Sequence, residues 1–225
     1  SIAYPIILSA PVLLSLLGIL ILKERIYLSK IISLGIAMFA VFLVSGFSLN
    51  QGFDPKGVLF LGKCGGLKQS AEIGRYIIPI AAIRGEGTSN DYLPPEVPAL
   101  PSFKLHKFVS DTVLDYGQEY RTGVIYTTNR RVWEWDNKFR KRLIDLSAIG
   151  IDMETATLFI VGHANKISRG AILLVSDMPL MPEGVKTQEM DKKVTAKYVD
   201  MHLEMGIQAM TDIEEKGEEI KHFGY

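Results

Sequence analysis

The chain has 225 residues, and its 25 Lys and Arg balance its 25 Asp and Glu, so the formal net charge at pH 7 is zero. This balance argues against a nucleic-acid-binding protein, which normally carries a basic excess or stripe. A single cysteine excludes an internal disulfide framework, and the four scattered histidines offer no metal-ligand spacing. We therefore expect no metal, no other cofactor and no nucleic-acid partner.

Residues 1–50 are far more apolar than the rest of the chain. Residues 2–22 and 31–49 form two uncharged runs, each close to the roughly 20 residues that a helix needs to cross a hydrocarbon core. These runs predict a two-helix transmembrane-like hairpin. The alternative is a pair of buried core helices, although core helices usually keep a polar face.

The stretch from Leu16 to Ile26, followed by a glycine-containing apolar helix, resembles the closing helix pair of an EamA-like drug/metabolite transporter. Transporters build their sites between repeats of many helices, so two helices imply at most a membrane anchor. Lys23, Arg25 and Lys30 favour a cytoplasmic connection, which would place both ends of the hairpin outside. We nevertheless expect a membrane-associated chain whose second part is cytoplasmic, because the family resemblance given below implies it.

A linker over residues 51–56 separates the hairpin of residues 1–50 from an alternation of strands and helices within residues 51–225. The expected elements, in chain order, are strand 58–61, strand 76–83, loop 86–101, helix 103–116, strand 123–127, helix 133–146, strand 149–152, helix 155–165, strand 171–176 and helix 189–215. This alternation predicts an α/β layered sheet. The run 171–176 is apolar throughout, as expected for a strand buried on both faces.

Chemically useful residues follow three of the expected strands. Asp177 ends the last strand, where open α/β sheets bind ligands; capping of the next turn is the alternative. Asp152 and Glu154 stand at a strand–helix junction, where acidic residues are also common because of the helix macrodipole. Gly62–Gly66 predicts a glycine-rich turn whose N–H groups hold an anion, with Lys63 adding positive charge, but its spacing matches neither the P-loop nor the dinucleotide fingerprint.

These three elements in this order resemble the nucleoside phosphorylase superfamily, and longer stretches are most similar to AMP nucleosidases. The resemblance covers about residues 58–225 and rests on residues 62–68, 93–98, 121–134, 151–157, 174–179 and 202–207. It implies a nucleoside-phosphorylase-type mixed sheet with flanking helices, and a homo-oligomer. It also implies an enzyme that hydrolyses the N-glycosidic bond of AMP or a related purine nucleotide, releasing adenine and ribose 5-phosphate.

The resemblance assigns catalytic roles to two carboxylates. Asp177 would be the general acid or hydrogen-bond donor at purine N7, since a buried carboxyl can have the raised pKa that this role requires. Glu154 would hold the ribose hydroxyls, and Met153 would pack against the sugar. Further substrate-binding candidates are Gly62, Lys63, Gly65, Gly66, Arg84, Thr127, Thr128, Arg130 and Ser176.

Three residues after the third expected strand have two interpretations each. Arg130 and Arg131 are candidates for binding a 5′-phosphate, and the simpler alternative is that one or both are solvated. Trp133 could stack on a base, but core packing is the better interpretation, because an amphipathic helix buries its aromatic residues.

Two departures from the family pattern bear on activity. The phosphorylases usually hold inorganic phosphate with an arginine and a serine around the glycine-rich loop, where this chain has Phe60 and Lys63. The exchange favours water as the nucleophile, with phosphorolysis as the alternative because Lys63 could hold an anion. Residues 1–50 replace the strands that open the family domain, so we expect a truncated sheet with an open parallel edge. Besides hydrolysis and phosphorolysis, a third hypothesis is therefore that the chain is an inactive membrane-anchored remnant.

Overall fold

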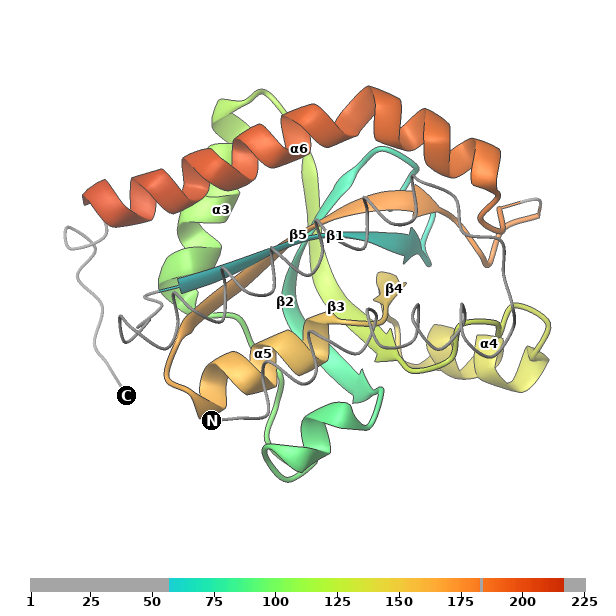
Figure 1. Cartoon of the computed structure of the whole chain (residues 1–225). Coiled ribbons are helices and arrows are strands. Elements are labelled where there is room, and N and C mark those ends of the chain that lie inside the picture. Colours follow the sequence, from blue (N-terminus) through green and yellow to red (C-terminus); the bar gives the residue numbers. More distant parts are fainter. Residues whose placement is uncertain (1–56, 183, 217–225) are drawn as a thin grey trace, which may run out of the picture. The chain divides into compact units, whose positions relative to one another are not determined.

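A computed structural model describes residues 57–182 and 184–216 of the chain (Figure 1). The hairpin expected over residues 1–50 lies outside these residues. Among the described helices, none combines the length and the apolar character needed to cross a membrane. The described residues belong to the compact unit Lys56–Tyr225.

The expected strands and helices are present in the expected order. They are β1 (Gly57–Gly66), β2 (Tyr76–Gly85), the 3₁₀-helix η1 (Thr88–Asp91), α3 (Phe103–Asp115), β3 (Tyr120–Thr128), α4 (Asn137–Asp145), β4 (Gly150–Asp152), α5 (Thr155–Ala164), β5 (Ser168–Asp177) and α6 (Gln188–Lys216). The α/β class is therefore confirmed. The strands are mostly longer than their apolar runs, because ladder pairing continues into polar and glycine residues.

The strands form a mixed sheet that closes on itself in the order β1-β4-β3-β2-β5. The pairs β1–β5, β2–β3 and β3–β4 are parallel, whereas β1–β4 and β2–β5 are antiparallel. The expected mixed sheet is thus confirmed, but it is a closed barrel instead of an open layer. The expected open edge persists in part: within the described residues, Gly57–Cys64 has a strand partner on one side only, because β4 reaches just Gly65 and Gly66.

The glycine-rich stretch from Gly62 to Gly66 continues β1, so the expectation of a turn is wrong. Gly62 pairs with Leu173 of β5, and the parallel register continues through Cys64 before it shifts at Gly65. An extended ladder lacks the concave row of N–H groups that forms an anion nest. Glycine is required at position 62 for packing, since a Cβ there would lie 2.5 Å from the Phe60 ring.

The helix expected from residue 133 begins four residues later, at Asn137. Asp136 caps it, because its Oδ1 accepts a hydrogen bond of 3.0 Å from the backbone N–H of Phe139, the arrangement that satisfies a free N–H in a first helical turn. Residues 129–136 therefore form a loop between β3 and α4, and this loop reaches the site described below.

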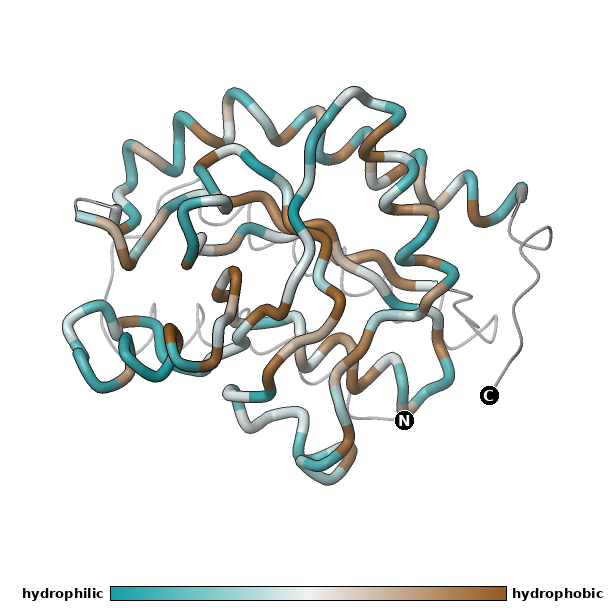
Figure 2. Tube along the Cα trace, turned by 180° about the vertical axis from the view of Figure 1, so that it is seen from behind, coloured by the Kyte–Doolittle hydropathy of each residue, from teal (hydrophilic) through white to brown (hydrophobic). Residues whose placement is uncertain are grey.

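Apolar layers cover both sides of β5. Leu173 and Val175 pack in one cluster with Phe159 of α5, while Ile172 and Leu174 pack in a second cluster with residues of α3 and α6. This alternation is the strand period of two, and it confirms burial on both faces. In Figure 1, α5 lies on one side of the strands and α3 and α6 on the other, and Figure 2 shows hydrophobic residues along the crossing strands between them.

Candidate active site

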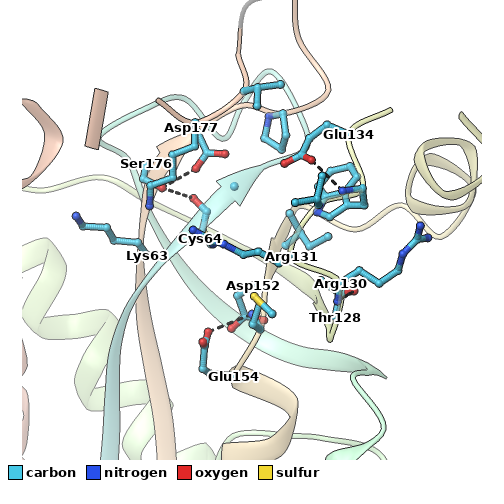
Figure 3. Close-up of a pocket in the computed structure, with 18 of the residues that line it drawn as sticks. Lys63, Cys64, Thr128, Arg130, Arg131, Glu134, Asp152, Glu154, Ser176 and Asp177 are labelled. Atoms are coloured by element: carbon cyan, nitrogen blue, oxygen red, sulfur yellow. Dashed lines mark hydrogen bonds between the residues drawn. The ribbon is translucent and has the colours of Figure 1, made fainter. Parts of the chain in front are cut away.

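A cavity of about 390 Å³ lies where the carboxyl ends of several strands meet. β1 contributes Cys64 and Gly65, β3 contributes Thr128, and β5 contributes Ser176 and Asp177. Three connecting segments complete the wall: the β4–α5 junction, the β3–α4 loop and the segment between β5 and α6. This is the place where α/β sheets bind ligands, and Figure 3 shows the side chains converging there.

Asp177 is a buried carboxyl with one oxygen left for chemistry. Its side chain is 8% exposed, and the Ser176 hydroxyl donates to its Oδ1 at 2.6 Å. Burial raises the pKa of Asp177, although the Ser176 hydrogen bond opposes the shift. No hydrogen bond reaches Oδ2 from the described part of the chain, so this oxygen can carry a proton towards a ligand. The alternative of a turn cap receives no support, because this carboxylate accepts no backbone N–H from residues 57–182 or 184–216.

The junction between β4 and α5 is fixed by Asp152, which the sequence places at this junction without a role in substrate binding or catalysis. Its Oδ1 accepts from the Thr127 hydroxyl at 2.8 Å, and its Oδ2 accepts from the Thr155 backbone N–H at 2.8 Å and from the Thr155 hydroxyl. Burial raises the pKa of Asp152 against these hydrogen bonds. Because Asp152 accepts the backbone N–H of Thr155, the first residue of α5, the adjacent Met153 and Glu154 are held in the wall of the cavity.

Glu154 lies across the cavity from Asp177 in Figure 3. Its Oε2 accepts a hydrogen bond of 3.1 Å from the backbone N–H of Met153, which leaves Oε1 free to accept. Two carboxyl groups therefore face one cavity from different surroundings. Burial favours the protonated form of Asp177, while Glu154 is exposed and can accept hydroxyl groups.

Lys63 borders the cavity, but its ammonium group is already engaged. It lies 2.9 Å from Asp191 Oδ1 and donates to the Thr195 hydroxyl at 2.6 Å, both on α6. Lys186 contacts the same Asp191 oxygen at 3.0 Å. The expected role of Lys63 in anion binding would therefore require it to leave its α6 partners.

Cys64 also lines the cavity, and sequence reasoning gave it no role. Burial raises the pKa of its thiol far above the usual value, and the charges of Asp152 and Asp177 raise it further. Because thiolate is the reactive form of cysteine, this neutral thiol acts as a wall of the cavity and not as a nucleophile.

Arg84 is not brought to the cavity. Its guanidinium donates to the Ser89 hydroxyl, the Asn90 side chain and the backbone carbonyls of Leu93, Pro94 and Val97. These bonds use all five of its N–H groups. Arg84 therefore holds the loop after β2 together, and its expected contact with substrate is replaced by this structural role.

The β3–α4 loop forms the side of the cavity opposite β5. Arg130 pairs with Asp136 at 2.9 Å and stacks 4.7 Å from the centroid of the Phe139 ring. Trp133 packs edge-on against the same ring at 5.5 Å, which confirms its core role, although it also borders the cavity. Trp135 borders the cavity with 76% of its surface exposed, and the sequence did not single it out.

The structure thus gathers most of the expected residues into one site. Those that line the cavity are Lys63, Gly65, Thr128, Arg130, Met153, Glu154, Ser176 and Asp177. The other four, Gly62, Gly66, Arg84 and Thr127, are not among its lining residues. Among the residues that the structure describes, no group of His, Cys, Asp or Glu could hold a metal ion.

Comparison with known proteins decides the family. A family model described as "Phosphorylase superfamily" matches residues 31–207. The chain belongs to the phosphorylase superfamily. The match starts at residue 31, within the range expected to form the second hydrophobic helix, and so gives the transmembrane-like hairpin no support. The site residues Asp177, Met153 and Glu154 all fall inside the matched range of this superfamily.

Relatives within the phosphorylase superfamily include nucleosidases and phosphorylases. The chain is 32% identical to AMP nucleosidase of Escherichia coli K12 over 175 residues, which are 74% of this chain and 36% of that protein. It is 29% identical to uridine phosphorylase of Treponema pallidum over 126 residues, which are 51% of this chain and 48% of that protein. The chain therefore spans only about a third to a half of these relatives.

Solved structures show the same fold. The crystal structure of AMP nucleosidase from Bacteroides thetaiotaomicron matches with a TM-score of 0.62 and 50% identity, covering 73% of this chain and 63% of that one. Uridine phosphorylase from Vibrio fischeri matches with a TM-score of 0.61 at 22% identity, covering 70% and 64%, which shows the fold alone. The fold is thus of the nucleoside phosphorylase type.

Proposed function

We propose that this site hydrolyses the N-glycosidic bond of a purine nucleoside 5′-monophosphate, with AMP as the first candidate. The observation that carries the proposal is the pair of carboxylates: Asp177 is buried with a raised pKa, and Glu154 faces it across a cavity of about 390 Å³. The 50% identity to an AMP nucleosidase supports this substrate class.

In the proposed reaction, Asp177 donates the proton on its Oδ2 to N7 of the purine as the bond between N9 and C1′ breaks. The base leaves neutral, and the sugar develops oxocarbenium character. Glu154 accepts hydrogen bonds from the ribose hydroxyls, which strengthen as positive charge grows on the ring. A water oxygen bonds to C1′, and its proton returns to the Asp177 carboxylate. The products are adenine and ribose 5-phosphate.

The choice of water over inorganic phosphate rests on two residues of β1, Phe60 and Lys63. Phe60 packs over Gly62 in the apolar interior and offers a phosphate no hydrogen bond. The ammonium group of Lys63 is bound to Asp191 and Thr195. Phosphorolysis is the second candidate, because a freed Lys63 would supply a cation beside Cys64 and Gly65.

A homo-oligomer is a further part of the proposal. Trp135 and Val132 border the cavity while 76% and 67% exposed. A neighbouring copy that covered them would also narrow the mouth of the cavity. Sedimentation velocity of the full chain tests this expectation, and a monomer at micromolar concentration would contradict it.

The test of the reaction is adenine release from AMP by the full chain in detergent, with and without inorganic phosphate. Asp177→Asn is the test variant. Asp111→Asn, an exposed aspartate paired with Lys107 on α3, is the matched control. Release that depends on Asp177 and not on phosphate supports hydrolysis, whereas release that requires phosphate supports the second candidate. No release under either condition would leave the third hypothesis, a catalytically inactive chain.

A further inference from the structure

Four cationic side chains border the cavity: Lys63, Arg130, Arg131 and Lys186. Three of them have an acidic partner. Lys63 and Lys186 share Asp191, and Arg130 pairs with Asp136. Because the charge of each of these three side chains is at least partly neutralised by a carboxylate, each attracts an anionic ligand less strongly than a cation without an ion pair does.

Arg131 differs from its neighbour in this respect. Within residues 57–182 and 184–216, its side chain has neither an ion pair nor a hydrogen bond. Its guanidinium makes no ion pair with Glu134, Glu154 or Asp177, which border the same cavity, although its charge lowers the pKa of Asp177 against the larger opposing effect of burial. In Figure 3 the Arg131 side chain lies across the middle of the pocket, with Asp177 on one side and Glu154 on the other.

The chemistry of a free guanidinium narrows the class of ligand. Its planar fork of N–H groups matches two oxygens of a phosphate, and the resulting charge-assisted hydrogen bonds are stronger than neutral ones. The rest of the pocket supplies four carboxyl groups, from Asp152, Glu154, Asp177 and Glu134, and a carboxyl group repels an anion whenever it is ionised. A ligand carrying a phosphate group therefore needs a cation that is not already neutralised.

We propose that Arg131 binds a phosphate group of the ligand, supplied either as the 5′-phosphate of a nucleotide or as free inorganic phosphate. This inference rests on the proposed function for the substrate class, since Asp177 and Glu154 would hold the base and the ribose. It assigns the anion to the β3–α4 loop, and not to the glycine-rich end of β1 or to Arg130.

The experiment measures binding, so that it does not depend on turnover. Dissociation constants of AMP, of adenosine, and of adenosine with inorganic phosphate are determined by titration calorimetry on the full chain in detergent. The parent is Asp177→Asn, which slows cleavage. Arg131→Gln is added to it as the test, and Arg142→Gln, on the exposed surface of α4, as the matched control. Lys186→Gln is the competing candidate, and circular dichroism checks that each variant is folded.

The expected result is that Arg131→Gln weakens AMP binding by about 10- to 100-fold, the loss expected for a charge-assisted hydrogen bond. Adenosine should change by less than about threefold, the scale of a weak exposed contact, and Arg142→Gln should leave both constants unchanged. If Arg131→Gln instead abolishes the effect of inorganic phosphate on adenosine binding, free phosphate is the source of the anion. Both results support Arg131 as the phosphate-binding residue.

Three results overturn the inference. Equal losses for AMP and adenosine would place Arg131 against the base or sugar. No loss in Arg131→Gln, or a selective loss of AMP in Lys186→Gln alone, would make Arg131 a solvated side chain. Absence of binding by the parent would show that the subsite is not formed. The proposed function fails separately: a chain that binds AMP through Arg131 without cleaving it would retain this inference and lose the hydrolase assignment.

Discussion

Replacing Asp177 by asparagine separates proton transfer from hydrogen bonding at one atom. Asparagine keeps an oxygen where Oδ1 accepts from the Ser176 hydroxyl at 2.6 Å, and it places an NH₂ group where Oδ2 stood. The amide can still donate a hydrogen bond to purine N7. It cannot transfer the proton that makes the base a good leaving group.

The expected loss follows from that difference. General acid catalysis by a positioned side chain is worth about 10²- to 10⁴-fold in rate, which corresponds to about 3–5 kcal/mol of barrier. Because the amide retains a hydrogen-bond donor at the same position, we expect kcat to fall by about 100-fold, the lower end of the range for general acid catalysis. KM for AMP should change little, since Glu154 and the walls of the cavity still hold the substrate.

Single-turnover adenine release over pH 5–9 provides the assay, with Asp111→Asn beside it. The variant should lose the alkaline limb that Asp177 imposes on the rate of the unmodified chain, since the acid works only while protonated. A folded Asp177→Asn variant that keeps more than about a third of the parent rate, far above the range for a lost general acid, would refute this assignment. The proton would then have to come from another group.

The same substitution makes a prediction about stability. A carboxyl whose pKa is raised in the folded state contributes its stability below its unfolded pKa of about 4 and loses it as the pH rises through the folded pKa. Burial raises the pKa of Asp177 in this way, so the ionised residue costs stability at neutral pH. Asp177→Asn should therefore have a higher free energy of unfolding than the parent at pH 7, measured by urea denaturation.

Three further substitutions test other parts of the site. Ser176→Ala removes a hydrogen bond that lowers the pKa of Asp177, so the alkaline limb of kcat/KM against pH should move to higher pH. Arg84→Met leaves three loop carbonyls without their donor and should lower the free energy of unfolding by about 2–4 kcal/mol in urea denaturation. Asp191→Asn removes the negative charge that pairs with Lys63 and leaves its hydrogen bond to Thr195. It should tighten the binding of inorganic phosphate, measured by calorimetry, and unchanged binding would show that Lys63 does not contribute to phosphate binding.

Local patterns placed Asp177 and Glu154 at the ends of strands, and the family resemblance then assigned them catalytic roles. Asp177 follows a run that is apolar on both faces, and strand ends of that kind meet at one edge of an α/β sheet. Glu154 stands at a strand–helix junction, where the sequence changes from a short strand-like run to a longer run with the spacing of a helix. Both placements depend on a few neighbouring residues, which is why the folded molecule reproduces them.

The remaining details depend on partners that are distant in the sequence. Gly62–Gly66 becomes strand because β5 pairs with it, and no local signal contains that pairing. Arg84 donates hydrogen bonds to backbone carbonyls, and these carbonyls point towards it only once the loop has folded. Arg130 and Arg131 are the same residue type at adjacent positions, and only the fold shows that one is paired. The start of α4 was readable from Asp136, but the apolar residues before it suggested an earlier beginning.

The pairing of β1 with β5 has a consequence for synthesis of the chain. Gly57 pairs with Ser168, so roughly 110 residues must be added after β1 has formed, which takes about 5–20 s at the usual rate of translation. Until β4 is made, the strand that carries Lys63 and Cys64 has neither of its two partner strands beside it. Chaperone binding in this window is therefore expected to affect the yield of this chain more than the stability of its finished fold does.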